Sequence, residues 1–341
     1  MGRKKRGILT FVLLPVLCLG IGIISLFLGR YNLEWEHFYI VLKSLFQENS
    51  TAYFQAETII LNIRFPRILA AFMVGGTLSL TGAAYQGMFR NPMVSPSILG
   101  VSSAAGFGAS LAILLALGTF WVQSISFLCG LGAIVVVYAV SLTVGKQHDR
   151  YLTLILSGMV VSAIFTALIS LMKYVADPYD TLPSIVYWLM GGLSNIELSE
   201  LRYVALIVLP GSILLSLSGW KLDVLSFGDD EAKSMGIHVE KIRVTVILIA
   251  TLMTAAVVSI SGIIGWVGLL VPHIARMIIG PGNSHLLPAS FFVGAAFLMI
   301  VDDFSRTMSS MEIPLGITTA LIGAPFFIFI LLKTSKKQRY D

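Results

Sequence analysis

The feature that most constrains this chain is a series of long charge-free segments, each about the length needed to cross a lipid bilayer. A membrane-spanning helix needs about 20 apolar residues, and a bilayer offers no water to an unpaired backbone group. The sequence therefore predicts an all-α integral membrane protein. The segments lie at 7–29, 68–89, 91–145, 151–172, 203–220, 244–275, 277–301 and 313–332.

The composition of the chain supports a membrane protein with a single domain. Of its 341 residues, 56% are hydrophobic and only 12% are charged. Soluble domains carry about 25% charged residues. No polar stretch is long enough to form a core of its own. We therefore expect one transmembrane domain over residues 1–341 and no attached catalytic domain.

The first apolar segment also resembles a secretory signal, because four basic residues precede it. Its uncharged run, 7–29, has 23 residues, and no small-x-small cleavage site follows. The apolar core of a signal peptide has about 7–15 residues, so we expect a retained helix. Cys18 and Cys129 both fall inside apolar runs and predict neither a disulfide nor a metal site.

The number of crossings follows from length and from the charges at the two ends. The run 91–145 holds two passes, so direct counting gives nine. Both ends of the chain are rich in Lys and Arg, which keeps them cytoplasmic and requires an even number of crossings. The extra pass fits best in 244–301, where glycines and Pro272 interrupt the run. We predict about ten transmembrane helices with both termini cytoplasmic, at approximately 7–29, 65–89, 96–116, 121–144, 151–172, 201–219, 244–262, 266–281, 286–305 and 314–332.

The distribution of charge agrees with this topology. The predicted cytoplasmic segments hold 16 of the 23 Lys and Arg residues, and the predicted outer segments hold 7 basic and 11 acidic residues. The outer segment 173–200 includes an apolar stretch that is too short to span the membrane. We expect a short helix lying in the outer leaflet there, with an ordinary amphipathic connector as the alternative.

The sequence carries no recognised catalytic motif. It lacks the G-x-x-x-x-G-K-[ST] pattern that binds nucleotides, the H-E-x-x-H pattern that binds zinc and the G-x-S-x-G pattern of serine hydrolases. Its five histidines are scattered, without acidic residues clustered beside them. We therefore predict no catalytic residue, no cofactor, no metal ligand and no nucleic-acid partner.

An ion-coupled secondary transporter is the alternative function. Such transporters need ionisable groups near the middle of the bilayer. Here every Asp and Glu falls in a predicted loop or at a helix end, and the main buried polar residues are Gln86, Asn91 and His273. Gln86 is read as a residue that hydrogen-bonds neighbouring helices. A transporter without its own ion relay must take its energy from another subunit.

The cytoplasmic segment 220–243 is a candidate contact for such a subunit. Acidic residues at 229–231 suit the first turn of a helix, where the helix dipole favours negative charge. Ala232, Met235 and Val239 recur on one face, and such a face can fill a groove on a partner. A solvated loop helix is the alternative. The candidate residues are Gly228, Asp229, Asp230, Glu231, Ala232, Met235 and Gly236.

Six separate blocks of the sequence resemble the FecCD-type permeases, the membrane subunits of ATP-driven importers for iron-siderophores, haem and cobalamin. The blocks follow the family's order and cover nearly the whole chain. Trp266, Met93-Val94 and Met235 depart from the usual residues, but all are apolar exchanges. The blocks are "RFPR" at 64–67, "GAAYQGMFRNPMVSPSILGVSSAAG" at 82–106, "YWLMGGLS" at 187–194, "SFGDDEAKSMGI" at 226–237, "GIIGWVGLLVPHIARMIIG" at 262–280 and "EIPLGITTALIGAPFFIFILLK" at 312–333.

The resemblance implies an importer of a large metal chelate in the cytoplasmic membrane of a prokaryote. The chain would form a homodimer with the translocation path on its twofold axis. Two cytoplasmic ATPase subunits would each grip the segment 226–237, and an extracytoplasmic binding protein would dock outside.

The resemblance also assigns two sets of residues. Arg64, Arg67 and Arg306 would be docking points for glutamates of the binding protein. The fifth and tenth helices, 151–172 and 314–332, would line the path with apolar and hydroxyl side chains. The candidate path residues are Gly316, Thr318, Thr319 and Gly323.

Overall fold

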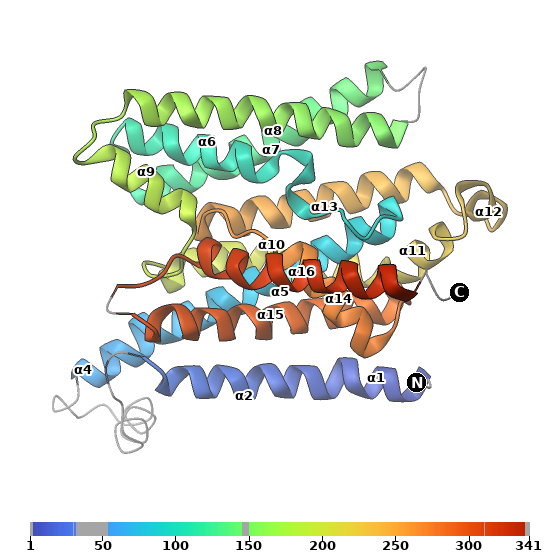
Figure 1. The fold of residues 1–341 in the computed structure, drawn as a ribbon, viewed down its shortest axis with the longest axis horizontal. Helices are drawn as coiled ribbons and strands as arrows, with labels where there is room; N and C mark the ends of the chain where they lie inside the picture. Colours follow the sequence, from blue (N-terminus) through green and yellow to red (C-terminus); the bar gives the residue numbers. More distant parts are fainter. Residues whose placement is uncertain (1–2, 30, 32–53, 145–149, 310, 338–341) are drawn as a thin grey trace.

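The computed structural model describes residues 3–29, 31, 54–144, 150–309 and 311–337, which form one helical bundle without a strand among them (Figure 1). The elements are α1 (Arg3–Ile8), η1 (Leu9–Leu13), α2 (Leu14–Phe27), α4 (Phe54–Glu57), η3 (Thr58–Arg64), α5 (Phe65–Phe89), η4 (Pro96–Leu99), α6 (Val101–Leu114), α7 (Thr119–Val144), α8 (Arg150–Val175), α9 (Thr181–Met190), α10 (Leu198–Leu217), α11 (Gly219–Leu225), α12 (Asp229–Ser234), α13 (Val239–Ser261), α14 (Val267–Ile279), α15 (Asn283–Thr307) and α16 (Leu315–Lys337).

Seven helices within the described ranges are long and apolar enough to cross a membrane. The predicted all-α membrane fold is therefore confirmed. The shorter apolar helices α6, α14 and α16 lie where the sequence predicts three further crossings. The short helix expected in 173–200 is present as α9.

The observed helix boundaries differ from the predicted ranges in two regions. The third predicted helix starts at Val101 rather than at 96, because Pro96–Leu99 forms a separate 3₁₀ turn and Gly100 has a positive φ of 79°. A glycine in this left-handed region separates the two elements without steric cost. The predicted cytoplasmic segment 220–243 contains two short helices, α11 and α12, and the first turn of α13.

Helix α5 is the centre of the bundle, because 89% of its membrane-length window is buried. It packs against α13, α14 and α15. Glycines permit these close contacts: a side chain at Gly75 would overlap the carbonyl of Gly294, and one at Gly82 would overlap the carbonyl of Gly268. Small residues at such crossings allow helices to pack closely where no hydrophobic effect drives them together.

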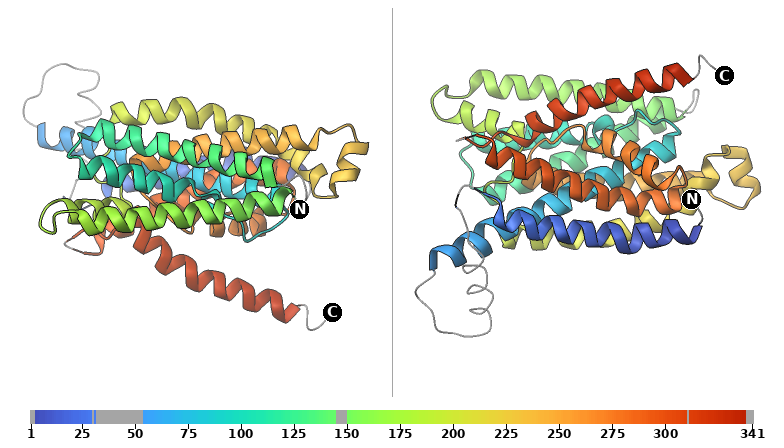
Figure 2. Two further views of the ribbon diagram at one scale, coloured as in Figure 1. Left: turned by 90° about the horizontal axis from the view of Figure 1, so that it is seen from above. Right: turned by 60° about the horizontal axis from the view of Figure 1, so that its bottom comes forward.

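Helix α16 is less embedded than α5. It contacts α9, α14 and α15 along its first half and then diverges from the bundle (Figure 2). Its apolar side chains are correspondingly exposed, with 71% of Leu321 and 58% of Ile328 accessible. This face needs lipid or another protein surface to cover it.

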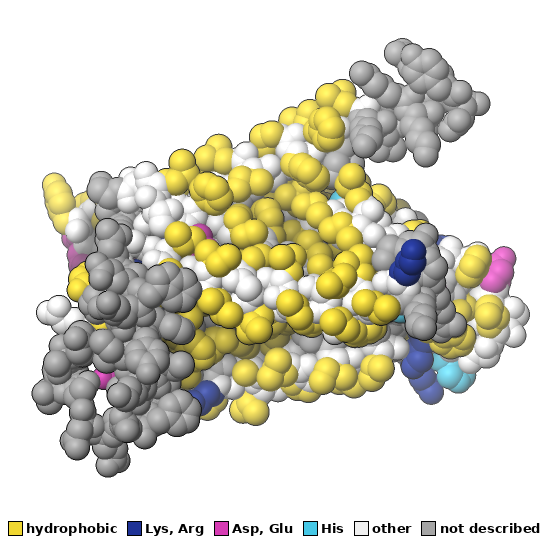
Figure 3. Space-filling view, turned by 90° about the horizontal axis from the view of Figure 1, so that it is seen from below, with side chains coloured by type: hydrophobic (Ala, Val, Ile, Leu, Met, Phe, Trp, Pro, Cys, Tyr) yellow, Lys and Arg dark blue, Asp and Glu magenta, His cyan; other side chains and the backbone are white. Residues whose placement is uncertain are grey.

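The bundle has two polar ends separated by an apolar band. Figure 3 shows hydrophobic side chains across the middle of one face, with charged side chains toward the ends. Helices α1 and α12 lie at the same end as the last turns of α16, whereas α4 and α9 lie at the opposite end (Figure 1). The first end corresponds to the predicted cytoplasmic side, and the second to the predicted outer side.

Candidate functional site

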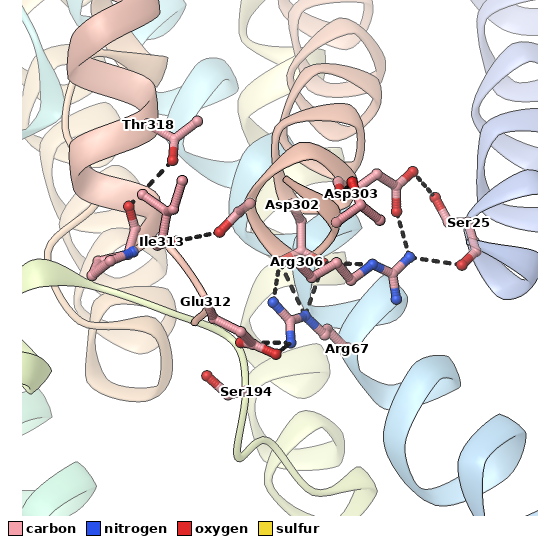
Figure 4. A network of polar contacts seen from close by, with 12 residues as sticks. Ser25, Arg67, Ser194, Asp302, Asp303, Arg306, Glu312, Ile313 and Thr318 are labelled. Atoms are coloured by element: carbon pink, nitrogen blue, oxygen red, sulfur yellow. Dashed lines mark hydrogen bonds and ion pairs between the residues drawn. The ribbon is translucent and has the colours of Figure 1, made fainter. Parts of the chain in front are cut away.

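At the predicted outer end, Arg67 is held by two carboxylates of its own chain (Figure 4). Its Nε donates to both oxygens of Asp302 at 3.0 and 2.9 Å, and its Nη2 donates to Oδ1 of Asp302 at 2.8 Å. Its Nη1 donates to both oxygens of Glu312 at 2.9 and 3.0 Å. Arg67 lies in the first turn of α5 and Asp302 near the end of α15, so this ion pair joins the two most closely packed helices.

Arg306 and Arg64 are also bound within the chain. The Nη2 of Arg306 donates to the carbonyl of Ser25 at 2.7 Å and to Asp303, which also accepts a hydrogen bond from the Ser25 hydroxyl. The guanidinium of Arg64 donates to two backbone carbonyls, those of Leu26 and Tyr31, at 2.6 Å each. We call the three arginines, together with Asp302, Asp303 and Glu312, the arginine cluster.

The arginine cluster is buried, which corrects the expectation that its arginines project from the surface. Arg64, Arg67 and Arg306 are 4%, 6% and 5% exposed. A buried charge has to be paired, because its desolvation is expensive. The six charges come from distant parts of the sequence and balance one another, three positive and three negative. Sequence reading missed the three carboxylates as partners, although all three lie in the outer segments together with the arginines.

The arginine cluster is connected to the start of α16. Glu312 lies between α15 and α16, and its neighbour Ile313 exchanges backbone and side-chain hydrogen bonds with Ser305. The N–H of Leu315 then donates to the carbonyl of Gly191 at 2.9 Å, directly after α9. One short segment therefore ties α5, α15 and α9 to the first turn of α16.

At the opposite end, α12 forms a small projection that carries exposed apolar side chains. Gly228 and Gly236, both with positive φ (135° and 79°), bracket the helix. Phe227 is 72% exposed and Met235 is 56% exposed. The predicted apolar face is wrong for two of its three residues: Ala232 is fully buried and Val239 is 4% exposed, and both belong to the protein's own core. The apolar surface available to a partner is formed instead by Phe227, which sequence reasoning missed, and Met235.

The acidic residues of α12 have different roles. Asp229 accepts two hydrogen bonds of 2.8 Å from Arg243 of α13, and it lies 3.7 Å from Arg90 at the end of α5. Asp230 and Glu231 are exposed. Asp229 therefore fixes α12 to the bundle.

The four candidate path residues do not share one surface. Thr319 is fully buried and donates to the carbonyl of Gly316 at 3.2 Å. A side chain at Gly323 would meet the Cβ of Trp266 at 2.7 Å, so this glycine faces α14. Gly316 and Thr318 are half-buried near α9 and the preceding loop.

Helix α8 presents a more continuous surface than α16 does. A shallow groove of about 590 Å³ runs along it. The wall is apolar with hydroxyl groups and carries no charged side chain. The lining residues are Ser97, Ile98, Met159, Ser162, Ala163, Thr166, Ala167 and Ser170.

No group of three or more His, Cys, Asp and Glu side chains is arranged to hold a metal ion within the described ranges. The buried carboxylates of the arginine cluster are occupied by guanidinium groups instead.

Comparisons with known proteins identify a family, related sequences and a solved structure with a similar fold. The model of the FecCD transport family matches residues 17–333. The molybdate import system permease protein MolB of Haemophilus influenzae is 40% identical over 92% of each chain. The cobalamin import system permease protein BtuC of Halobacterium salinarum is 39% identical over 81% of this chain and 74% of its own. A solved metal-chelate type ABC transporter in an inward-facing conformation superimposes with a TM-score of 0.84 at 38% identity, covering 94% of this chain and 97% of that one.

Proposed function

The chain belongs to the FecCD transport family, and from this premise we propose that it works as the permease of an ATP-driven importer that takes up a large metal chelate. It is a multi-pass protein of the prokaryotic cytoplasmic (inner) membrane. The observation that carries the proposal is the exposed projection at α12, because a transport subunit without a nucleotide-binding motif needs a surface on which an ATPase can act.

The proposed assembly has one partner for each uncovered surface. Two ATPase subunits bind the α12 projections of a homodimer, with Phe227 and Met235 as apolar anchors. The second copy of the chain lies opposite the α8 groove and the exposed face of α16, so that the path runs between the two copies, and lipid covers the remaining apolar band. An extracytoplasmic binding protein delivers the chelate at the end that carries the arginine cluster.

The cargo is a ferric siderophore, haem or cobalamin. The uncharged wall of α8 supports this choice, because apolar and hydroxyl groups let a bulky chelate pass without a tight site. Molybdate is a second candidate, favoured by the 40% identity to the Haemophilus permease named for that oxyanion.

Ion-coupled transport by this chain alone is less well supported. The buried carboxylates Asp302 and Asp303 lie in the last two turns of α15 and are paired with arginines. A proton or ion relay needs groups near the midplane that can change their charge.

The experiment is uptake into proteoliposomes that contain the permease with its cognate ATPase and binding protein. Labelled ferric siderophore, haem, cobalamin and molybdate are supplied outside, with ATP inside. We expect ATP-dependent accumulation of one chelate by the full assembly, and none by the permease alone under a proton or sodium gradient. Gradient-driven accumulation by the permease alone would overturn the proposal.

A further inference from the structure

A cavity of about 900 Å³ lies at the predicted outer end of the bundle, apart from the arginine cluster and from the α8 groove. It is enclosed by the first turns of α7 and α10, the last turns of α13, and the end of α9 with the loop that follows it. The left view of Figure 2 shows α10 on the side of the bundle opposite to α8 and α16. Beside the cavity, Leu206 of α10 is 73% exposed. The cavity therefore opens toward lipid and away from the proposed path.

The walls of the cavity change from polar at the mouth to apolar at depth. The carboxylates Glu197 and Glu200 line it at the start of α10. Ile207 of α10 and Phe127 of α7 line its deeper part. Because a helix rises 1.5 Å per residue, Ile207 lies about 15 Å along the helix axis from Glu197. A polar mouth above an apolar interior of this depth matches the headgroup and the upper acyl chain of a lipid.

The two carboxylates at the mouth have spare capacity for a cation. No Lys, Arg or His is found among the described residues that line the cavity. Glu200 accepts a hydrogen bond from the N–H of Glu197 at 3.3 Å, and Glu197 accepts one from the Ser199 hydroxyl at 3.2 Å. A carboxylate has two oxygens and about four acceptor positions, so these bonds leave room for an ammonium group.

Aromatic side chains line the same cavity. Tyr187 and Trp188 come from α9, and Tyr203 comes from α10. The Oη of Tyr187 lies 3.1 Å from the Oγ of Ser194, which holds this ring against the loop before α10. Ring faces attract ammonium groups, and Tyr and Trp are favoured where a membrane meets water. The cavity thus combines negative charge and aromatic rings with an apolar interior.

We propose that this cavity binds one aminophospholipid of the outer leaflet, of the phosphatidylethanolamine class. The ammonium group binds Glu197 and Glu200, and one acyl chain lies along Phe127 and Ile207. The phosphate lies near Thr119, where the hydroxyl can donate to it and the start of α7 favours a negative charge. The inference does not depend on the cargo or on the ATPase.

The bound lipid would support α9 from the side opposite to α16. The carbonyl of Gly191, directly after α9, accepts the hydrogen bond from Leu315 in the first turn of α16, whereas Tyr187 and Trp188 line the cavity. A ligand that binds only the folded protein raises its stability. We therefore expect phosphatidylethanolamine to raise the thermal unfolding midpoint of the purified chain.

The test is native mass spectrometry of the purified full-length chain, delipidated in detergent and titrated with phosphatidylethanolamine or phosphatidylglycerol of the same acyl chains. Phosphatidylglycerol has the same phosphate but a neutral glycerol in place of the ammonium. We expect one phosphatidylethanolamine to bind about 5-fold more tightly than phosphatidylglycerol, the upper end of the range for a partly exposed ion pair.

Ile207→Trp tests the apolar part of the cavity by filling it. We expect phosphatidylethanolamine to bind about 10-fold more weakly, which corresponds to the lost burial of roughly two CH₂ groups. The matched control is Leu206→Trp, which adds the same side chain to the neighbouring position, outside the lining. Phosphatidylethanolamine should bind this control as it binds the wild type, and should raise its unfolding midpoint.

Glu200→Gln tests the charge at the mouth. Glutamine can keep the bond to the backbone at the start of α10, because Gln also serves at this position of a capping box. We expect the preference for phosphatidylethanolamine to fall about 3-fold, with no loss of phosphatidylglycerol binding. The control is Asp180→Asn, which removes the same charge from an exposed position at the same predicted end, outside the lining.

Three results would overturn the inference. The first is equal binding of the two lipids by the wild type. The second is equal binding of phosphatidylethanolamine by the folded Ile207→Trp and Leu206→Trp variants. The third is an unchanged lipid preference in Glu200→Gln, and this variant decides if Ile207→Trp does not fold.

Discussion

The two ends of the bundle place their side chains in opposite ways: one end buries charged residues, and the other exposes apolar ones. At one end the arginine cluster buries five charges and satisfies them within the chain, and only its sixth member, Glu312, remains accessible at the edge. At the other end an aromatic ring and a methionine are exposed on the two sides of α12, at Phe227 and Met235, and Asp229 holds the helix in place. A set of charged residues can therefore hold helices together inside the protein, whereas a short helix in a loop can present side chains to a partner.

The side chains at one end therefore matter for folding stability, and those at the other end matter for binding. Buried ion pairs contribute little net stability relative to an apolar core, but they are costly to break because one charge remains unpaired. An exposed aromatic side chain costs nothing to the isolated chain and stabilises a complex when a partner covers it. We expect substitutions in the arginine cluster to affect folding, and substitutions around α12 to affect assembly.

The largest effect is expected for Asp302→Ala. The variant leaves Nε and Nη2 of Arg67 buried without their partner, which costs about 3–5 kcal/mol. The unfolding midpoint and the yield of purified protein should both fall sharply. The matched control is Asp230→Ala in α12, which removes a carboxylate that is 93% exposed and should leave both unchanged. Equal stability of the two variants would contradict the description of the arginine cluster as internal structure.

The next effect is expected for Phe227→Glu, and it concerns assembly. Loss of a central aromatic anchor costs about 2 kcal/mol or more, which corresponds to roughly 30-fold weaker association with the ATPase. Tyr179→Glu is the control, because Tyr179 is 94% exposed at the opposite end of the bundle. The ATPase should be lost on co-purification with the first variant only, while both variants remain folded.

A smaller effect is expected for Asp229→Asn. The substitution weakens the two charge-assisted hydrogen bonds from Arg243, which hold α12 against α13. Because the Asp229 side chain is 26% exposed, we expect a loss of about 1.5–2 kcal/mol, the lower part of the range for such bonds. Backbone amides of α12 should exchange their hydrogens faster, and ATP-driven uptake should fall. Unchanged exchange rates would show that α12 is held by packing alone.

The smallest effect is expected for Lys233→Ala. Lys233 pairs with Asp230 at 3.1 Å, but both side chains are largely exposed, and such surface pairs contribute little. Stability and co-purification of the ATPase should stay within measurement error of the wild type. Loss of the ATPase in this variant would instead place Lys233 among the anchors and enlarge the contact surface.

The sequence predicts the fold well because lipid-length apolar runs and basic ends act locally. The runs recover the seven long helices, and the glycine and proline signals around 262–272 mark the short helix α14. The boundaries that differ, such as the start of α6, depend on a single turn. The arrangement of the helices follows from contacts such as Gly75 with Gly294, which no local pattern reveals.

The functional residues were harder to predict, because their environment is set by distant partners. Arg67 and Asp302 are 235 positions apart, so the charge of Arg67 was visible in the sequence while its pairing was not. Ala232 was expected at an interface because it shares a helical face with Met235, but the bundle buries it. The same limit applies to Thr319 and Gly323, which face the interior although α16 as a whole is exposed.

The central claim is that the α12 end, and not the arginine end, meets the ATPase. The most direct test places a photo-crosslinking amino acid at position 227 in one variant and at position 179 in another, each co-expressed with the cognate ATPase and irradiated in membranes. We predict a crosslinked permease–ATPase adduct from position 227 and none from position 179. An adduct from position 179, or its absence from position 227 in a complex that still transports, would contradict the claim.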